Sequence, residues 1–311
     1  MSIQKLESKI QETEQLIELK RSQSEQGNFA LSLSIKSLEN HLDDLRLQLM
    51  REKQLREKEV IELRLIGGEV NNGTVPLEIL ANLAKTFSGL ISSASAKIKL
   101  GQDISGVIPF EVTQPLNLRF ADIGHGSSRL FVTGDSSPDL FGDSLLESSL
   151  HGLFELLNQD LNEGISDQVH YMGLRSTHNL AEFLKVLRKR SIELELSWVA
   201  PNAQKHSWYG RWDKIQTLEK LLDGFSATDP TSVTIEGIIE LISKSGKVDI
   251  RTSNDELIKV TYSKKLYGEV RKLRLGDHVR FDCKEVTVFN ASTQESRNKY
   301  SLSNVLWEKL S

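Results

Sequence analysis

The strongest constraint on the fold is an apolar repeat in alternating steps of four and three residues. Its members are Leu31, Ile35, Leu38, Leu42, Leu45 and Leu49. This spacing places apolar side chains on one stripe of an α-helix, which is the a/d pattern of a coiled coil. Residues 51–59 then alternate acids and bases at helical spacing, so the helix can continue in water. We predict one long helix from Leu31 that passes into a strand at residues 62–66.

A second helix is predicted from Met1 to about Arg21, where apolar residues again recur on one stripe. The stretch 22–28 between the two helices is polar and ends in Gly27-Asn28, a pair that favours a left-handed turn. We therefore predict a coiled-coil helical hairpin over residues 1–62, and one unbroken helix with a polar gap is the alternative. An isolated hairpin buries little apolar surface, so we expect its stripe to pack on a second copy or on another subunit.

Composition restricts the class of protein. The chain has 311 residues, of which 38% are hydrophobic and 26% are charged, as in ordinary globular domains. It contains no apolar run of about 18 residues, and its N-terminus does not have the pattern of a signal peptide. A single cysteine, Cys283, excludes an internal disulfide and a cysteine-rich zinc site. We expect a cytoplasmic protein with no membrane span, no metal site and no cofactor.

The middle of the chain, residues 63–226, predicts an α+β domain with a mixed or antiparallel sheet. Pro76 marks the start of one helix, and Ser144 with Glu147 forms the capping box of another. The predicted helices are 76–91, 144–158, 177–190 and 213–222, and the predicted strands are 107–112, 116–120, 129–133 and 192–199. Residues 223–232 are rich in turn-forming residues and predict a domain boundary.

The last part, residues 231–311, predicts a small β-module. Short apolar strands recur at 233–242, 247–251, 257–262 and 279–288. About five strands in a segment of roughly 80 residues suit a partly closed barrel of the OB or SH3 type. Barrels of these types bind nucleic acid or peptides, so the fold alone assigns no function.

Two groups of basic and aromatic residues are candidate surfaces for nucleic acid or a protein partner. Cations neutralise phosphates and aromatic rings stack on bases, and the same residues form protein interfaces. Core packing of the tryptophans is the alternative. The first group is Arg188, Lys189, Arg190, Lys205, His206, Trp208, Tyr209, Arg211 and Trp212, and the second is Lys264, Lys265, Arg271, Lys272 and Arg274. Residues 231–311 hold 14 Lys and Arg against 11 Asp and Glu, a small excess for a dedicated nucleic-acid binder.

Three short patterns suggest catalysis, and each has a simpler explanation. Gly142-Asp-Ser-Leu145 with Asp167 and His170 spells the motifs of the Gly-Asp-Ser-Leu hydrolases, but the motifs lie too close together and Ser144 fits a helix N-cap better. Arg119 and His125 have the spacing found in small helical ribonucleases, yet they fall across a strand and a loop. The Gly124–Ser128 loop leads into a strand, so we expect a tight hairpin and not a phosphate site. Enzymatic activity is uncertain, and an unrecognised hydrolase or nuclease stays an alternative.

One resemblance adds to this interpretation. Leu116-Asn-Leu-Arg-Phe120 and Gly126-Ser-Ser-Arg-Leu-Phe-Val132, followed by a leucine-rich helix, resemble uncharacterised bacterial proteins found beside nucleases and ATPases in anti-phage defence loci. The resemblance implies an accessory subunit and transfers no site residue. We expect a non-enzymatic scaffold that joins a homo-oligomer or a hetero-complex through its coiled coil. The alternative is a nucleic-acid-binding protein that uses the β-module and the Trp208–Trp212 cluster.

Overall fold

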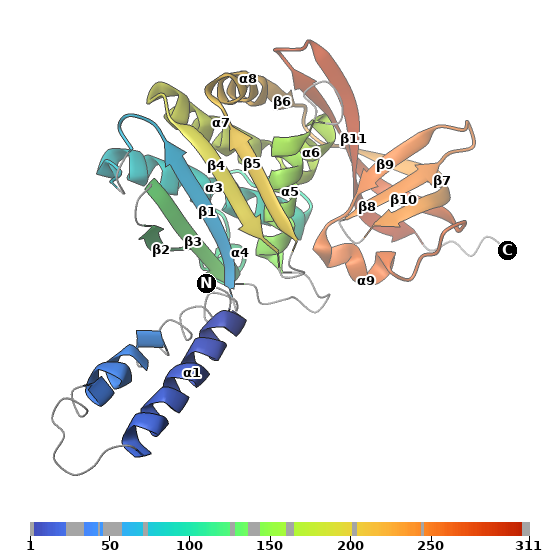
Figure 1. Ribbon diagram of the computed structural model, residues 1–311. Coiled ribbons are helices and arrows are strands. Elements are labelled where there is room, and N and C mark those ends of the chain that lie inside the picture. The colour runs from blue at the N-terminus through green and yellow to red at the C-terminus, as the bar shows by residue number, and fades with distance from the viewer. Residues whose placement is uncertain are drawn as a thin grey trace. The chain divides into compact units, whose positions relative to one another are not determined.

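The chain forms two compact units, residues 1–58 and residues 59–311. The second unit is a mixed α+β structure with two sheets, as predicted (Figure 1). The computed structural model describes residues 3–22, 34–42, 44–45, 58–70, 74–124, 128–135, 144–159, 165–200, 204–243 and 246–306. Within these ranges, none of the helices combines the length and the apolar content that a bilayer crossing needs.

The first unit contains helix α1 (Ile3–Ser22) and further helical residues at 34–42 and 44–45. Two polar contacts join the two stretches. Arg21 Nη2 lies 2.5 Å from Glu39 Oε1, and Lys20 Nζ donates to Ser34 Oγ at 2.8 Å. The predicted turn at 22–28 falls almost entirely outside the described residues, as do Leu31 and Leu49.

The predicted passage from helix to strand near residue 62 is wrong in its position. Strand β1 already begins at Lys58 and runs to Ile66. Ile61, Leu63 and Leu65 are buried while the residues between them are half-buried, which is the two-residue period of a strand. The charges near residue 59 suggested a helix, but burial of alternate side chains favours the strand.

The first sheet has five strands in the order β2-β3-β1-β4-β5. Strand β1 pairs antiparallel with β4, as do β2 with β3 and β4 with β5, and Leu63 lies opposite Leu196. Its other strands are β2 (Arg119–Gly124), β3 (Ser128–Asp135), β4 (Glu193–Val199) and β5 (Lys205–Gly210). One face carries the buried side chains, and helices cover that face (Figure 1).

The helices of this layer pack on one another as well as on the sheet. Helix α3 contacts α5, α6 and α7, and α8 contacts α7. Their bounds are α3 (Leu77–Leu100), α5 (Leu145–Asn158), α6 (Ile165–Met172), α7 (Leu174–Lys189) and α8 (Trp212–Asp223). Helix α3 is longer than predicted. Gly101 follows its last residue as a left-handed C-cap with a φ of 79°. Ser144 caps α5 as predicted, because its hydroxyl accepts the N–H of Glu147 at 2.9 Å.

Some sequence predictions are wrong or incomplete. The strand predicted at 107–112 is a loop followed by α4 (Phe110–Thr113) and the turn η1 (Gln114–Leu116). Pro109 has no N–H to give to a sheet, and its φ of −57° suits the residue that precedes a helix. Sequence patterns also missed α6, β5, β6 (Phe225–Ala227) and β11 (Glu295–Leu306).

The C-terminal part is a closed five-stranded barrel, which confirms the predicted β-module at that level. The strands follow the order β11-β9-β8-β7-β10, and a further pairing of β10 with β11 closes the ring. The remaining barrel strands are β7 (Thr231–Ser243), β8 (Lys247–Arg251), β9 (Leu257–Thr261) and β10 (His278–Asn290). Turn η2 (Lys264–Leu266) and helix α9 (Tyr267–Val270) connect β9 to β10. Val248, Val260 and Phe281 lie at the centre of its core.

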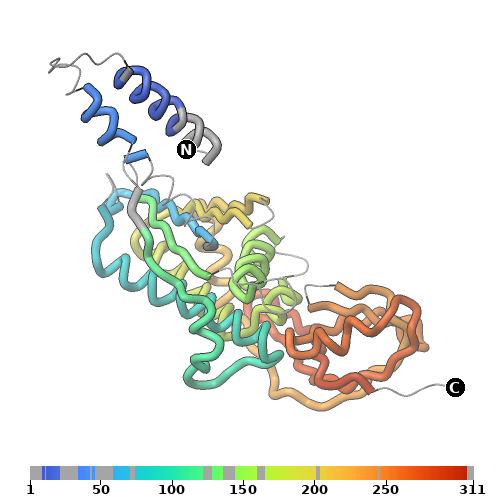
Figure 2. The backbone as a smooth tube through the Cα atoms, turned by 90° about the horizontal axis from the view of Figure 1, so that it is seen from below, coloured from blue at the N-terminus to red at the C-terminus, as the bar shows by residue number. Residues whose placement is uncertain are grey.

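The stretch 223–232, predicted as a domain boundary, contains a strand of the second sheet. Strand β6 pairs with β10, with Phe225 opposite Asn290. Phe225 and Val288 both belong to the core of the helical layer. Figure 2 shows the barrel, in orange and red, beside the green helices of that layer. The contacts therefore keep residues 59–311 in one unit.

Gly237 provides a test of the close approach between β7 and β8 in the barrel. A Cβ at Gly237 in β7 would come within 2.3 Å of the backbone oxygen of Arg251. Because backbone atoms cannot move aside cheaply, Gly237→Ala should lower the free energy of unfolding by about 1–3 kcal/mol. Gly268→Ala in α9 is the control, since a Cβ there meets nothing within 4 Å and alanine favours helix. Urea unfolding measures both, and equal stability of the two variants would contradict the packing described here.

Candidate functional site

A buried polar seam joins helix α6 to the barrel strands β9 and β11. His170 Nε2 lies 3.1 Å from Thr261 Oγ1 and 3.1 Å from Ser301 Oγ, and the two hydroxyl oxygens lie 3.2 Å apart. Burial, together with the nearby Lys97 and Lys299, lowers the pKa of His170 to about 3. His170 is therefore a neutral imidazole that shares hydrogen bonds with two hydroxyl groups at neutral pH.

Carboxylates of the helical layer meet lysines of the barrel around this histidine. Asp167 pairs with Lys299 and, at 3.6 Å, with Lys259. Burial alone would raise the pKa of Asp167, but the hydrogen bond and charge of Lys299 and the charge of Lys259 leave it lowered. Glu155 Oε2 lies 4.0 Å from Lys247 Nζ. Each of these lysines comes from a different barrel strand, so the two acids form ion pairs with β8, β9 and β11.

The connection between β10 and β11 is fixed in a similar way. Asn290 Nδ2 donates to the carbonyl of Leu221 at 3.0 Å, and Ser292 Oγ donates to the carbonyl of Lys220 at 3.1 Å. The N–H of Ala291 donates to the carbonyl of Gly224 at 2.9 Å. The end of helix α8 thus holds a second edge of the barrel.

The seam brings together a serine, a histidine and an aspartate, but not as a catalytic triad. His170 and Ser301 are 6% and 8% exposed, so a substrate has little access to the hydroxyl. Asp167 pairs with lysines, whereas a triad needs it to orient the imidazole. Ser144 of the hydrolase-like motif is also buried and acts as a helix cap. The seam is consequently a structural contact.

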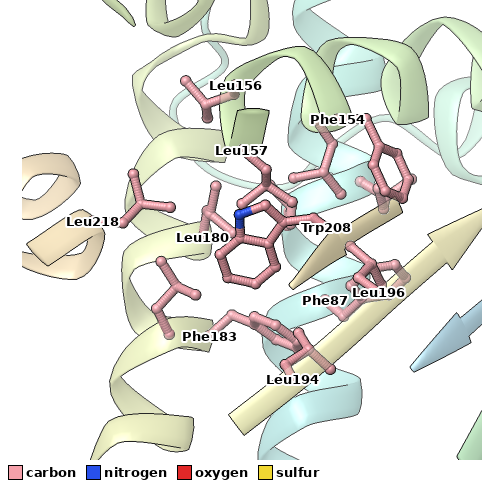
Figure 3. Packing of buried hydrophobic residues seen from close by; sticks show 14 of the residues in the cluster. Phe87, Phe154, Leu156, Leu157, Leu180, Phe183, Leu194, Leu196, Trp208 and Leu218 are labelled. Atoms are coloured by element: carbon pink, nitrogen blue, oxygen red, sulfur yellow. The ribbon is translucent and has the colours of Figure 1, made fainter. Parts of the chain in front are cut away.

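The first predicted basic and aromatic group is divided by the structure. Trp208 is 2% exposed and lies in the core, where Leu157, Phe183 and Leu196 surround its ring (Figure 3). Its Nε1 is buried without a hydrogen-bond partner among the described atoms. The cavity beside it holds only about 10 Å³ and is lined by apolar side chains, so it offers no place for a ligand.

Four other members of that group contact acids. Arg188 pairs with Glu219, and Arg190 pairs with Glu78 at 3.0 Å and with Glu69 at 3.5 Å. The Tyr209 hydroxyl and the backbone N–H of Trp212 both donate to Glu193, at 2.8 and 3.2 Å. Lys189, Lys205 and Arg211 are exposed, and His206 is half-buried against Trp198.

The second predicted group stays together on the connection between β9 and β10. Exposed side chains there are Lys265, Arg271, Lys272 and Arg274, while Lys264 is half-buried. Lys272 pairs with Glu269 at 2.9 Å. The other exposed cations make this connection a positive surface of the barrel.

The predicted N-terminal stripe is described in part. Leu42 and Leu45 are buried, and Ile35 and Leu38 are half-buried. On helix α1, Ile17 is buried but Leu16 and Leu19 are 44% and 56% exposed. The first unit therefore presents two leucines that are partly exposed to solvent.

A groove that sequence reasoning missed opens between helix α3 and the β2–β3 hairpin; we call it the α3 groove. Its volume is about 180 Å³. Arg119 Nε donates to Asn117 Oδ1 at 2.9 Å, and Asn117 Nδ2 donates to Asp135 Oδ2 at 2.9 Å. The lining is Leu63, Leu80, Leu83, Ala84, Phe87, Ser88, Leu118, Arg119, Phe120, Leu130 and Val132. In the sequence most of these residues look like ordinary core, so no motif signals the groove.

Among the residues that the structure describes, no group of three or more His, Cys, Asp or Glu side chains could hold a metal ion. Comparison of the chain with protein-family models, with curated proteins and with solved structures finds no match. A functional assignment therefore has to come from the geometry.

The low pKa of His170 predicts a specific loss of stability in acid. The unfolded histidine titrates near 6.5, whereas the folded one has a pKa of about 3, so between these values only the unfolded state binds the proton. Stability should fall as the pH drops below about 6.5, by up to roughly 1.4 kcal/mol per pH unit from this group. His170→Gln should remove that component, as measured by urea unfolding between pH 7 and pH 4.

His151→Gln is the matched control for this measurement. A hydrogen bond with Glu155 raises the pKa of His151, so its contribution is present at low pH and is lost as the pH rises through the folded pKa. Removal of His151 should therefore make the acid loss steeper. If His170→Gln keeps the pH dependence of the wild type, the conclusion that His170 is a buried neutral imidazole is incorrect.

Proposed function

We propose that this protein is a non-enzymatic scaffold or accessory subunit that assembles through a coiled coil formed by its N-terminal helices. The observation that carries the proposal is the separate compact unit of residues 1–58, which leaves Leu16 and Leu19 exposed on α1. A pair of helices this short buries too little apolar surface to be stable alone. The exposed leucines supply a surface on which a second copy or a partner helix packs.

The rest of the chain supports an accessory role. In the seam, Ser301, His170 and Asp167 make structural contacts. Ser144, the serine of the hydrolase-like motif, caps helix α5. We place the protein in the cytoplasm, within a complex of the kind that bacterial anti-phage defence loci encode, following the resemblance of residues 116–132. The partner is a second copy or another subunit of that complex.

Two exposed leucines allow this proposal to be tested without changing a buried position of the first unit. Leu16→Glu with Leu19→Glu should abolish self-association or capture of the partner subunit, because charges in an apolar interface remain unpaired. The thermal transition of residues 59–311 should not change. Size-exclusion chromatography with light scattering gives the mass, and a pull-down from the native host gives the partner.

Two further variants complete the design. Lys9→Glu changes the charge of α1 by the same two units at an exposed position and should leave assembly intact. Leu42→Glu with Leu45→Glu changes buried positions, so it should abolish assembly and also melt the helices of the first unit. A wild-type monomer that captures no partner would refute the proposal, and so would full assembly of the Leu16 and Leu19 variant.

The second candidate function is nucleic-acid binding through the barrel. We infer that the barrel is of the OB type, because β9 runs parallel to β11 and a helix connects β9 to β10. Barrels of this type bind ligands on their second and third strands and on the loops after the first and fourth. Here Lys247 of the second strand, β8, pairs with Glu155, and Lys259 of the third strand, β9, pairs with Asp167. Carboxylates of the same chain thus pair with lysines that phosphates would otherwise contact.

Nucleic acid would consequently contact the positive connection around α9. Reversing Lys265, Arg271 and Arg274 to Glu should abolish salt-sensitive binding of a single-stranded oligonucleotide. For a single strand, the slope of log affinity against log salt concentration is about −0.7 for each phosphate that the protein contacts. Reversal of Lys36, Lys85 and Lys220, three exposed cations outside both candidate surfaces, is the control. Fluorescence anisotropy at 50 and 200 mM salt measures binding, and wild-type protein that shows none removes this candidate.

A further inference from the structure

We propose that an apolar strip on the outer surface of the barrel binds the same strip on a second copy of this chain. We call it the barrel strip, and its apolar members are Ile238, Leu241, Leu257 and Leu275, each between 42% and 67% exposed. They come from β7, β9 and the turn before β10. All of them belong to the barrel, so the proposal is independent of the assembly through the first unit.

The register of the barrel strands makes these side chains one continuous surface. Arg251 of β8 lies opposite Ile238 of β7 on one side and opposite Leu257 of β9 on the other. Directly opposed residues of neighbouring strands share a face and lie about 5 Å apart. The aliphatic stem of Arg251 therefore lies between the two apolar residues. His278 of β10 lies opposite Ile238 and continues the row onto a fourth strand.

Leu241 and Leu275 widen this row into a strip. Leu241 lies opposite Asp249 on the outer face of β7 and β8. The N–H of Gly276 donates to the carbonyl of Ile239 at 2.9 Å, so the turn that carries Leu275 runs alongside β7. Single exposed apolar residues are ordinary on a protein surface, whereas a contiguous group of them marks an interaction site.

The chemistry of the barrel strip favours a protein over nucleic acid. Its apolar side chains are aliphatic, whereas the bases of a single strand stack on aromatic rings. Two carboxylates hold Arg251, with Glu240 Oε2 at 2.9 Å from its Nη2 and Asp255 Oδ1 at 3.0 Å from its Nη1. The guanidinium is therefore already neutralised, and a phosphate would be repelled by the acids beside it. An arginine fixed among apolar residues is typical of the centre of a protein interface.

The charges at the two ends of the strip favour a second copy as the partner. At the β9 end the exposed Glu256 precedes Leu257, and at the β10 end the exposed Arg274 precedes Leu275. A two-fold axis across the middle of the strip brings Glu256 of each copy to Arg274 of the other. The apolar centre then meets itself, and the charged ends pair twice. A partner surface with charges of one sign would complement only one of these ends.

Analytical ultracentrifugation of the full chain with Leu16→Glu and Leu19→Glu tests the barrel strip without assembly through the first unit. The mass of this parent should rise from monomer to dimer with concentration, since a strip this small supports only weak association. Adding Ile238→Glu and Leu257→Glu should abolish the dimer, because charges at its centre remain unpaired. Adding Val107→Glu and Phe110→Glu instead, two exposed apolar positions outside the barrel, is the control and should leave the dimer intact.

A charge exchange in the same parent tests the two-fold arrangement with variants that keep the apolar centre. Glu256→Arg or Arg274→Glu alone should weaken the dimer about tenfold, because each change occurs at two symmetry-related contacts. The two changes together restore both pairs with reversed sign, so the affinity should return to within about threefold of the parent. Single variants that associate like the parent, or a combined variant without recovery, would overturn the proposal.

The remaining outcomes separate this surface from the other candidates. A parent that stays monomeric at every concentration overturns the barrel strip, whatever the wild-type chain does through Leu16 and Leu19. A dimer that survives Ile238→Glu with Leu257→Glu overturns it as well. If the parent does not self-associate and these two changes abolish binding of a single-stranded oligonucleotide, the strip belongs to nucleic acid and not to a second copy.

Discussion

The alternation of buried and half-buried side chains along β1 is the constraint on which residues 59–311 depend. β1 is the central strand of its sheet, and Ile61, Leu63 and Leu65 bring its apolar side to one face. The helices have to lie on that face, because the other carries ion pairs such as Arg64 with Glu195 at 3.0 Å. Since the described helices of this layer cover that face, the cover is less complete at the edge strand β2, where Phe120 is 52% exposed. The α3 groove is the result.

The seam at the barrel is the second determinant of the structure, and it acts through charge. Asp167 and Glu155 neutralise lysines on three barrel strands, so that part of the barrel carries little net charge. Lys265, Arg271 and Arg274 around α9 are exposed, and the positive potential of the barrel is concentrated there. A barrel that makes this many contacts with its own helical layer is part of one folded body and not a tethered module.

Sequence patterns predicted the elements whose signals are local. The cap at Ser144, the alternation in β4 and most barrel strands needed only neighbouring residues. Pro109 is a local signal as well, because a residue without an N–H argues against a strand at 107–112. The seam could not be predicted, because His170 meets Ser301 across 131 residues. Trp208 shows the same limit, since its burial depends on pairing with Leu196 and not on the cations beside it in the sequence.

The pairing of β1 with β4 also sets an order of events during synthesis. Arg64 and Glu195 are 131 residues apart, whereas Arg21 and Glu39 are 18 apart. At about 5–20 residues per second, the ribosome needs roughly 7–26 s to deliver β4 after β1 has emerged. Throughout that interval one edge of β1 has no strand beside it, and an unpaired edge invites contact with other chains. The N-terminal helices are complete much earlier, so the association proposed above would begin on the polysome while the body that follows them is unfinished.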